Sequence, residues 1–477
     1  MSSRWTSRLP DVMARADWWL DGPLLKPIRR ILEALIVAAG PWVLAVVTLA
    51  LIGRAAERWL IPETLEDVRL AVVYAFMIAP MVAAPLGIIA ARLITTTSEP
   101  TNNAPAVAAL MLVTCGIAGL IGQAFAAMAV FALSLSNPEL ALAFVVLTSS
   151  SAMMWTAFII MNACRLRPHL VLSFAAGMGL ALTLCHFSIQ VSVSGALLVW
   201  GFTAGIALSF ALCLAPFRMM DLSPALMRQT VVDLWKAACV TWPLALGALL
   251  AMVGIWADKW LAWTGPNGLV SAAGFLHSPT YDSALFLAHL SAVPGLAALT
   301  IHFENPARRA MAKFQNILTN GASLQAAEQA GEVLAAKLWS GVHRTLLAQL
   351  ALSGLLLLLA PTIAAVAGLR LDQFLILRTA LIGSLLHILF LSTSAVLILC
   401  NRKPAFLVLQ LLFLITNVSG TVILSAIYGT TALGFTIAAA VGSIAATIYA
   451  RETLRDVLRH CYLTGNEALF RKEKNTG

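Results

Sequence analysis

The chain has 477 residues, of which 60% are hydrophobic and 11% are charged, and it carries a formal net charge of +9. An ordinary soluble domain has about 25% charged residues, so this composition excludes a water-soluble globular protein and indicates a polytopic membrane protein. The positive charge does not indicate nucleic-acid binding, because the basic residues are spread over short loops and the tails and do not gather on one face.

Long apolar runs are the main signal along the chain. A spanning helix needs roughly 20 residues, because about 30 Å of hydrocarbon is crossed at about 1.5 Å per residue. Twelve runs satisfy this length, so the sequence predicts an all-α polytopic membrane protein with twelve transmembrane helices. The predicted spans are 34–53, 70–91, 106–132, 141–163, 170–190 and 195–215, then 238–256, 284–303, 346–368, 379–400, 405–427 and 430–450.

These spans divide into two six-helix bundles. A basic, Trp-containing leader (1–33) precedes the first, and its composition favours a helix lying on the cytoplasmic surface rather than a cleaved signal peptide. The remaining divisions are an N-terminal bundle (34–215), a cytoplasmic linker (216–236), a C-terminal bundle (237–450) and a cytoplasmic basic tail (451–477).

The Lys and Arg residues give the orientation. With the N-terminus in the cytoplasm, 6 of the 31 fall in predicted outer loops and the other 25 in the tails and inner loops. Positive residues collect on the cytoplasmic side of membrane proteins. We therefore expect both termini in the cytoplasm.

The largest inner loop, 304–344, has helical patterning of its own. Met311, Phe314 and Leu318 recur at helical spacing, while Arg308 and Lys313 fall on other faces. The pattern predicts an amphipathic helix. It favours a helix on the membrane surface over a docking face for a partner protein, although both interpretations stay open.

The first and seventh predicted helices resemble one another at an offset of 201 residues. Gly53 and Glu57-Arg58-Trp59 correspond to Gly254 and Asp258-Lys259-Trp260. Two parallel six-helix repeats could rock against each other about a cavity at their interface.

Several prolines fall inside the predicted spans. Each removes a backbone donor and can kink its helix, which would supply a hinge or shape a lumen. Ordinary membrane-helix prolines, tolerated where neighbours satisfy the freed carbonyl, are the equal alternative. The hinge candidates are Pro41, Pro85, Pro243 and Pro294.

Polar and ionisable residues are concentrated between Asp258 and Gly295. Such groups are costly in hydrocarbon, so they mark candidate functional positions. Charges and Trp at helix ends more often anchor a helix at the interface. His289 follows Asp282 by seven residues, so the two should lie on nearly the same face of one helix. A neutral ring bonded to a backbone carbonyl is favoured for His289 over a proton carrier near Asp282. The candidates for a substrate pathway are Trp42, Asp258, Trp260, Trp263, Tyr281, Asp282 and His289.

Known catalytic patterns are missing from the sequence. It has no phosphate-binding Gly-x-x-x-x-Gly-Lys motif, no metal-ligand spacing of His, and no CxxC among its seven cysteines. We therefore expect neither an enzyme nor a cofactor or metal, and we interpret the cysteines as small apolar residues.

Short motifs resemble the PelG family of exopolysaccharide exporters, which belongs to the multidrug/oligosaccharidyl-lipid/polysaccharide (MOP) flippase superfamily. They are Gly40-Pro41-Trp42, Asp258-Lys259-Trp260, Ser278-Pro279-Thr280-Tyr281-Asp282, Pro294-Gly295 and Asn320-Gly321-Ala322-Ser323-Leu324. The leader and the end of the second span, Ala91-Arg92-Leu93, depart from the family pattern, which would suit a divergent branch that exports another polymer.

The resemblance implies a multi-pass transporter in a bacterial inner membrane that passes an amino-sugar-containing exopolysaccharide, or its precursor, to the periplasm. It also implies partners, namely a cytoplasmic glycosyltransferase and membrane-anchored regulatory proteins, besides the lipid bilayer. An ion-coupled drug or lipid antiporter of the same superfamily is one alternative. A non-transporting membrane scaffold for a polysaccharide synthase is another.

Overall fold

The computed structural model describes residues 40, 43–96, 104–191, 194–217, 222–320 and 323–460. The leader, Pro41 and Trp42 lie outside the described residues, as does the tail beyond His460. Predictions that fall on those positions therefore stay predictions.

Long apolar helices make up almost all of the described chain. Eleven are long and apolar enough to cross a membrane, and a shorter apolar helix covers Val43–Ala56. The all-α polytopic fold is therefore confirmed. The helices are α3 (Pro62–Thr96), α4 (Ala104–Leu133), α5 (Pro138–Ala163), α6 (Arg167–Val191), α7 (Gly195–Leu214), α8 (Pro224–Trp263), α9 (Pro279–Leu290), α10 (Ala292–Leu299), α11 (Asn305–Thr319), α12 (Leu324–Val366), α13 (Leu371–Leu399), α14 (Lys403–Tyr428) and α15 (Leu433–Arg455).

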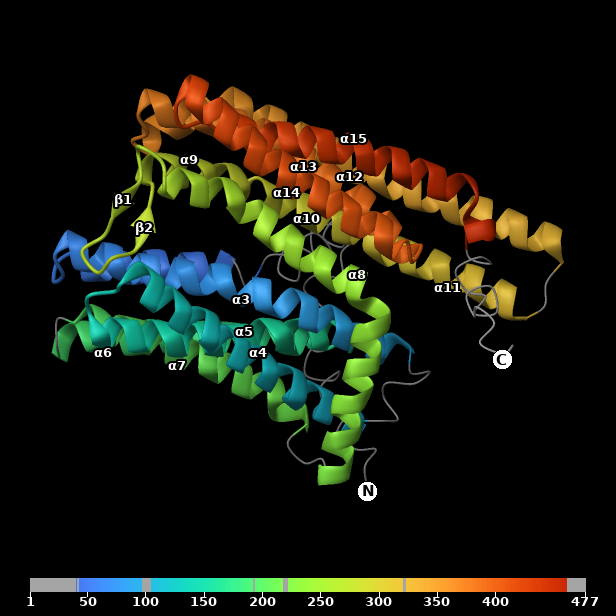
Figure 1. The fold of residues 1–477 in the computed structure, drawn as a ribbon, viewed down its shortest axis with the longest axis horizontal. Coiled ribbons are helices and arrows are strands. Elements are labelled where there is room, and N and C mark those ends of the chain that lie inside the picture. Colours follow the sequence, from blue (N-terminus) through green and yellow to red (C-terminus); the bar gives the residue numbers. More distant parts are fainter. Residues whose placement is uncertain are drawn as a thin grey trace, which may run out of the picture.

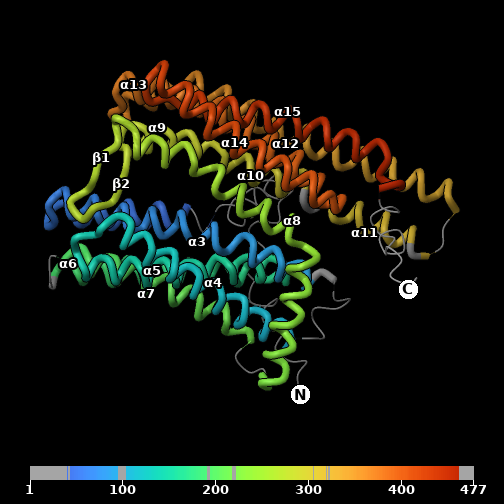
Figure 2. Tube along the Cα trace, viewed as in Figure 1, coloured from blue at the N-terminus to red at the C-terminus, as the bar shows by residue number. Residues whose placement is uncertain are grey.

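The helices are arranged in two groups, with α8 running between them (Figure 1). Helices α3 to α7 pack on one another, and α9 to α15 form the second group. Helix α8 contacts α3 and α4 of the first group and α14 of the second. In the Cα trace the blue-to-green segment and the yellow-to-red segment lie on opposite sides of α8 (Figure 2).

Several helices are longer than the apolar runs that predict them. Helix α8 begins inside the expected linker 216–236, where Ser223 accepts a hydrogen bond from the Leu226 N–H and Pro224 occupies the first turn. Helix α12 likewise begins at Leu324, with Ser323 as its cap, well before the predicted span 346–368. Hydropathy marks only the part of a helix that could lie in hydrocarbon, whereas caps set where the helix begins.

The apolar face of the amphipathic loop helix is covered by the protein itself. Phe314 of α11 is buried against Leu334 and Leu338 of α12. The favoured interpretation of this face as a membrane-surface helix is therefore wrong for Phe314. Sequence patterning shows that a face is apolar but not which surface covers it.

Prolines and a helix break interrupt the long helices. Pro85 lies inside α3 and Pro243 inside α8, which changes direction along its length (Figure 1). Pro294 lies in the first turn of α10, just after Ser291 separates α9 from α10. The predicted span 284–303 is thus divided between two helices that are followed by a π-helical turn at Thr300–Glu304.

The connection between α8 and α9 is a short β-hairpin. Strands β1 (Leu269–Val270) and β2 (Leu276–His277) are antiparallel, with Leu269 opposite His277 and Val270 opposite Leu276. Gly274 has φ +109°, a conformation that side chains with a Cβ rarely adopt. The spans predicted from the sequence end at residue 256 and resume at 284, with no strand predicted between them.

Candidate functional site

A buried carboxylate joins α8 to two helices of the second group. Asp258 on α8 is fully buried, and the Tyr281 hydroxyl on α9 donates a hydrogen bond to its Oδ2 at 2.5 Å. Asn417 on α14 places Nδ2 3.5 Å from Asp258 Oδ1 and donates to the Gly254 carbonyl at 2.9 Å. The carboxylate is therefore held by internal partners, as buried charges require.

This burial corrects the expectation for the second of the two helix ends that match at an offset of 201 residues. Charges at both ends were expected to reach water, and Glu57 and Trp59 are indeed exposed, Trp59 by 58%. Asp258, the counterpart of Glu57, is 0% exposed. Because α8 continues to Trp263, Asp258 lies inside the helix and packs against α9 and α14, whereas the predicted span ended at residue 256.

Of the two residues after Asp258, Lys259 bonds within α8 and Trp260 reaches the first group of helices. The Lys259 Nζ donates to the Ile255 carbonyl at 2.8 Å and lies 4.9 Å from the centre of the Trp256 ring. The Trp260 Nε1 lies 3.0 Å from the Met77 sulfur of α3. Trp260 therefore contacts the first group, whereas Asp258 contacts α9 and α14 of the second group.

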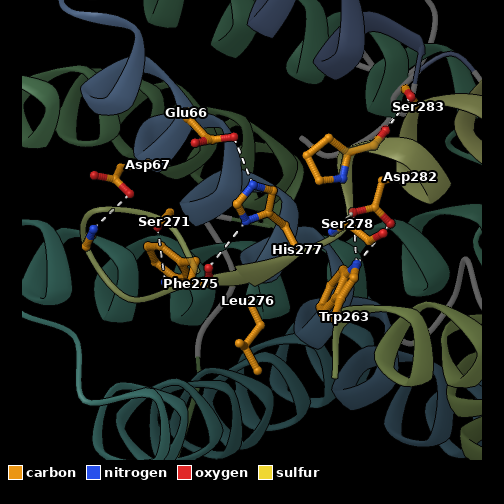
Figure 3. A network of polar contacts seen from close by, with 12 residues as sticks. Glu66, Asp67, Trp263, Ser271, Phe275, Leu276, His277, Ser278, Asp282 and Ser283 are labelled. Atoms are coloured by element: carbon orange, nitrogen blue, oxygen red, sulfur yellow. Dashed lines mark hydrogen bonds and ion pairs between the residues drawn. The ribbon is translucent and has the colours of Figure 1, made fainter. Parts of the chain in front are cut away.

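A second carboxylate fixes the end of the hairpin to α9. The Trp263 Nε1 donates to both oxygens of Asp282, each at 2.9 Å, and the Ser278 N–H donates to Asp282 Oδ2 at 2.9 Å (Figure 3). Ser278 is the residue before α9, so a carboxylate in the first turn also interacts favourably with the helix dipole. Asp282 thus holds the last residue of α8 against the first turn of α9.

The hairpin, which follows α8 in the chain, also contacts α3, which lies well before α8. His277 Nε2 lies 2.9 Å from Glu66 Oε1, and Asp67 Oδ1 accepts from the Ala273 N–H at 3.1 Å (Figure 3). The Tyr74 hydroxyl donates to the Leu276 carbonyl at 2.7 Å. These polar contacts link residues about 200 positions apart.

An aromatic residue of the hairpin is buried among the helices of the first group. Phe275 is 0% exposed, with its ring centre 5.1 Å from that of Tyr74 and 5.6 Å from that of Phe144. Trp263 stacks on the other side of this region, 5.1 Å from Tyr74. The aromatic contacts give the hairpin an apolar attachment to α3 and α5 beside its hydrogen bonds.

Two histidines lie in the interior of the second group. His289 Nδ1 is 2.9 Å from the Leu285 carbonyl, the bond expected of a neutral ring, and its ring centre is 5.3 Å from that of Phe435. His387 also contacts Phe435, at 5.8 Å. His289 and Asp282 both lie on α9. Asp282 pairs with Trp263, and His289 with the Leu285 carbonyl.

The structure therefore brings the predicted residues together in two pairs. Asp258 pairs with Tyr281, and Asp282 with Trp263, while Trp260 and His289 lie apart from both pairs. Sequence reasoning missed Asn417, although a lone amide inside a predicted span is a recognisable signal. It also missed the acceptors on α3 and the hairpin donors, whose pairing depends on the tertiary fold.

A second polar region lies at the other end of the second group, where α12 begins and α15 ends. A cavity of about 390 Å³ is lined there by Glu328 and Glu332 of α12 together with Arg455 and Arg459. Arg451 lies 5.2 Å from the centre of the Trp339 ring. Within the described part of the chain, no group of three His, Cys, Asp or Glu side chains is placed to hold a metal ion.

Comparisons with known proteins identify the family and the fold. The PelG family, described as "Putative exopolysaccharide Exporter (EPS-E)", matches residues 21–462. No curated protein matches the sequence.

Among solved structures, a MOP superfamily transporter from Pyrococcus furiosus is similar with a TM-score of 0.63 at 17% identity, covering 90% of this chain and 96% of that one. Its description states that the reverse polarity of its binding pocket suggests a different function. An outward-facing multidrug resistance MATE transporter is similar with a TM-score of 0.61 at 18% identity, covering 89% and 96%. An inward-facing one has a TM-score of 0.61 at 15% identity, covering 86% and 95%. At these identities the likeness shows the fold.

Proposed function

The chain belongs to the PelG family of exopolysaccharide exporters, and from this premise we propose that it moves an exopolysaccharide or its precursor from the cytoplasm to the periplasm. Membership of this family and the MOP transporter fold make it a multi-pass membrane transporter. The family match over nearly the whole chain is the observation that carries the proposal. The two helix groups separated by α8 supply the architecture for alternating access.

We propose an amino-sugar-containing, Pel-like polymer as the substrate. Aromatic side chains stack on sugar rings, and Trp42, Trp260 and His289 are the candidates for the wall of its pathway. Asp258, Tyr281, Trp263 and Asp282 bond to one another in pairs, which favours a role behind the wall, in holding α8 and α9 in position.

The orientation proposed for this function has both termini in the cytoplasm and the helices in the bacterial inner membrane. Three connections expected on the outer side lie together. They are the one that leads into α3, the one between α4 and α5, and the hairpin between α8 and α9, which contacts both of the others. This proximity supports the proposed alternation of the loops. Under this orientation the α11–α12 region faces a cytoplasmic glycosyltransferase, and regulatory membrane proteins would complete the assembly.

An ion-coupled drug or lipid antiporter is the second candidate, because the solved neighbours include multidrug resistance transporters. A scaffold for a polysaccharide synthase is the third, favoured by the cavity at the start of α12. The three differ in where polymer accumulates. Loss of an exporter leaves polymer made but retained, loss of a scaffold prevents its synthesis, and loss of an antiporter changes drug tolerance.

The test is deletion of the gene in its native host, followed by complementation. Extracellular and intracellular polysaccharide, the membrane fraction of the glycosyltransferase and tolerance of cationic drugs are measured together. We expect extracellular polymer to disappear, the synthase to stay in the membrane and drug tolerance to be unchanged. Normal extracellular polymer in the deletion strain would refute the proposal.

A further inference from the structure

We propose that the hairpin 264–278 is a latch, which joins the outer ends of the two helix groups and must detach before the pathway opens to the outside. This inference rests on the proposed function for its direction. The attachment itself is a property of the fold and can be tested without any substrate.

One side of the latch belongs to the second group. Both ends of the hairpin are fixed there, since Trp263 at the end of α8 and Ser278 before α9 both donate to Asp282. The Asn267 Nδ2 adds a bond of 2.9 Å to the Thr430 hydroxyl, between α14 and α15. The hairpin would therefore move with the second group.

The other side of the latch is made of contacts to the first group. They come from two separate segments, the start of α3 and the connection between α4 and α5. Asp67 accepts from the Ala273 N–H, and the Ser136 N–H donates back to the Ala273 carbonyl at 3.0 Å. One hairpin residue is therefore bonded through both its N–H and its carbonyl to the opposite group.

The remaining contacts make the attachment specific in position. The Ser136 hydroxyl donates to the Ala272 carbonyl at 3.2 Å, and the Cβ of any residue at position 274 would lie 3.1 Å from the Leu133 carbonyl. Phe275 is inserted between Tyr74 and Phe144. Separating the outer ends of the groups would expose Phe275 and free the hydrogen-bonding groups of Ala273, so these contacts must break together.

The direct test locks the latch with a disulfide. Ser136 and Ala272 are both exposed, and their backbones lie side by side, so the pair Ser136→Cys with Ala272→Cys can be oxidised after Cys239 and Cys461 are replaced by Ser. We expect oxidation to reduce extracellular polymer at least tenfold and a reductant to restore it. Each single-cysteine variant should export normally in both conditions.

A matched control crosslinks the same end of the molecule within one group. Gln373 of α13 donates to the Ser283 hydroxyl of α9 at 2.9 Å, so Ser283→Cys with Gln373→Cys joins two helices that stay together. Its oxidation should leave export within twofold of the reduced protein. Equal loss in both pairs would overturn the latch, because a crosslink at this end would then be harmful in itself.

A measurement on purified protein separates the latch from the transport activity. Spin labels at Glu63→Cys and Leu371→Cys, exposed on the first and second groups, report the distance between their ends. Replacing Asp67 by Ala and Tyr74 by Phe removes two latch contacts, and we expect a longer and broader distance distribution. An unchanged distribution overturns the latch, whatever the substrate proves to be. A lengthened distribution in a protein that exports no polymer overturns only the proposed function.

Discussion

The hydrogen bond between Tyr281 and Asp258 gives the sharpest prediction for stability. Tyr281→Phe removes only the hydroxyl that donates to Asp258 at 2.5 Å, and both side chains are buried, at 1% and 0% exposure. Asn417 at 3.5 Å is a poor replacement for the lost donor. A hydrogen bond to a charged group contributes about 1.5–3 kcal/mol. At about 2–4 °C per kcal/mol for a unit of 150–250 residues, the Tm should fall by about 3–12 °C.

Unfolding can be followed through the buried thiol of Cys400, which follows α13 in the second group and reacts with a maleimide dye as the purified protein is heated in detergent. The control is the same substitution in an Asp258→Asn background. The amide oxygen still accepts there without a full charge, so Tyr281→Phe should cost about 0.5–1.5 kcal/mol. A Tm change below about 1 °C, or an equal loss in the two backgrounds, would refute the assignment of a charge-assisted bond.

Two further substitutions test packing and the second carboxylate. A Cβ at Gly205 would overlap the Gly177 carbonyl and lie 2.7 Å from the Ala181 Cβ, so Gly205→Ala should force α6 and α7 apart and lower the free energy of unfolding by about 1–3 kcal/mol, seen as a lower Tm. The control is Gly179→Ala, which has nothing within 4 Å of its added Cβ and should leave the Tm unchanged or higher. Asp282→Asn replaces one acceptor oxygen by a donor that faces the Trp263 or Ser278 N–H, so extracellular polymer should fall by about tenfold at unchanged protein level on an immunoblot. Unchanged export would remove Asp282 from the working parts of the transporter.

The helices could be predicted from the sequence because hydrocarbon imposes a length on every apolar run. The same reasoning fails where a helix leaves the membrane. The first turns of α8 and α12 are set by the caps Ser223 and Ser323, which hydropathy does not register. Phe314 shows a related limit, since its apolar face was recognised but its partner, α12, was not.

The hairpin was beyond sequence reasoning for a different reason. Its strands have two residues each, too few for an alternating pattern to be visible. Its partners Asp67, Tyr74 and Ser136 lie between about 130 and 210 positions away, and nothing local to them indicates an acceptor or donor for a distant backbone. The sequence could single out Asp258 and Asp282 as candidate functional acids. It could not show that Asp258 pairs with Tyr281 and Asp282 with Trp263.

The two helix ends that match at an offset of 201 residues have different surroundings in the structure. Beside Gly53, the guanidinium of Arg69 occupies the space that a side chain would need, and Arg69 also lies 3.8 Å from Glu57 at the surface. Beside Gly254 the space is occupied by the Phe413 ring, and one turn along α14 Asn417 bonds to Gly254 and approaches Asp258.

The glycine four residues before the acid is thus packed against Arg69, beside an exposed ion pair, in the first half. In the second half it is packed against Phe413, beside a buried polar network. A surface pair of this kind contributes about 0–1 kcal/mol, whereas loss of a partner from a buried carboxylate costs several. Asp258 is therefore more important for holding α8, α9 and α14 together than for attracting a cationic polymer. Under the proposed function, we expect the substrate to contact side chains around this network, which its bonds hold in position.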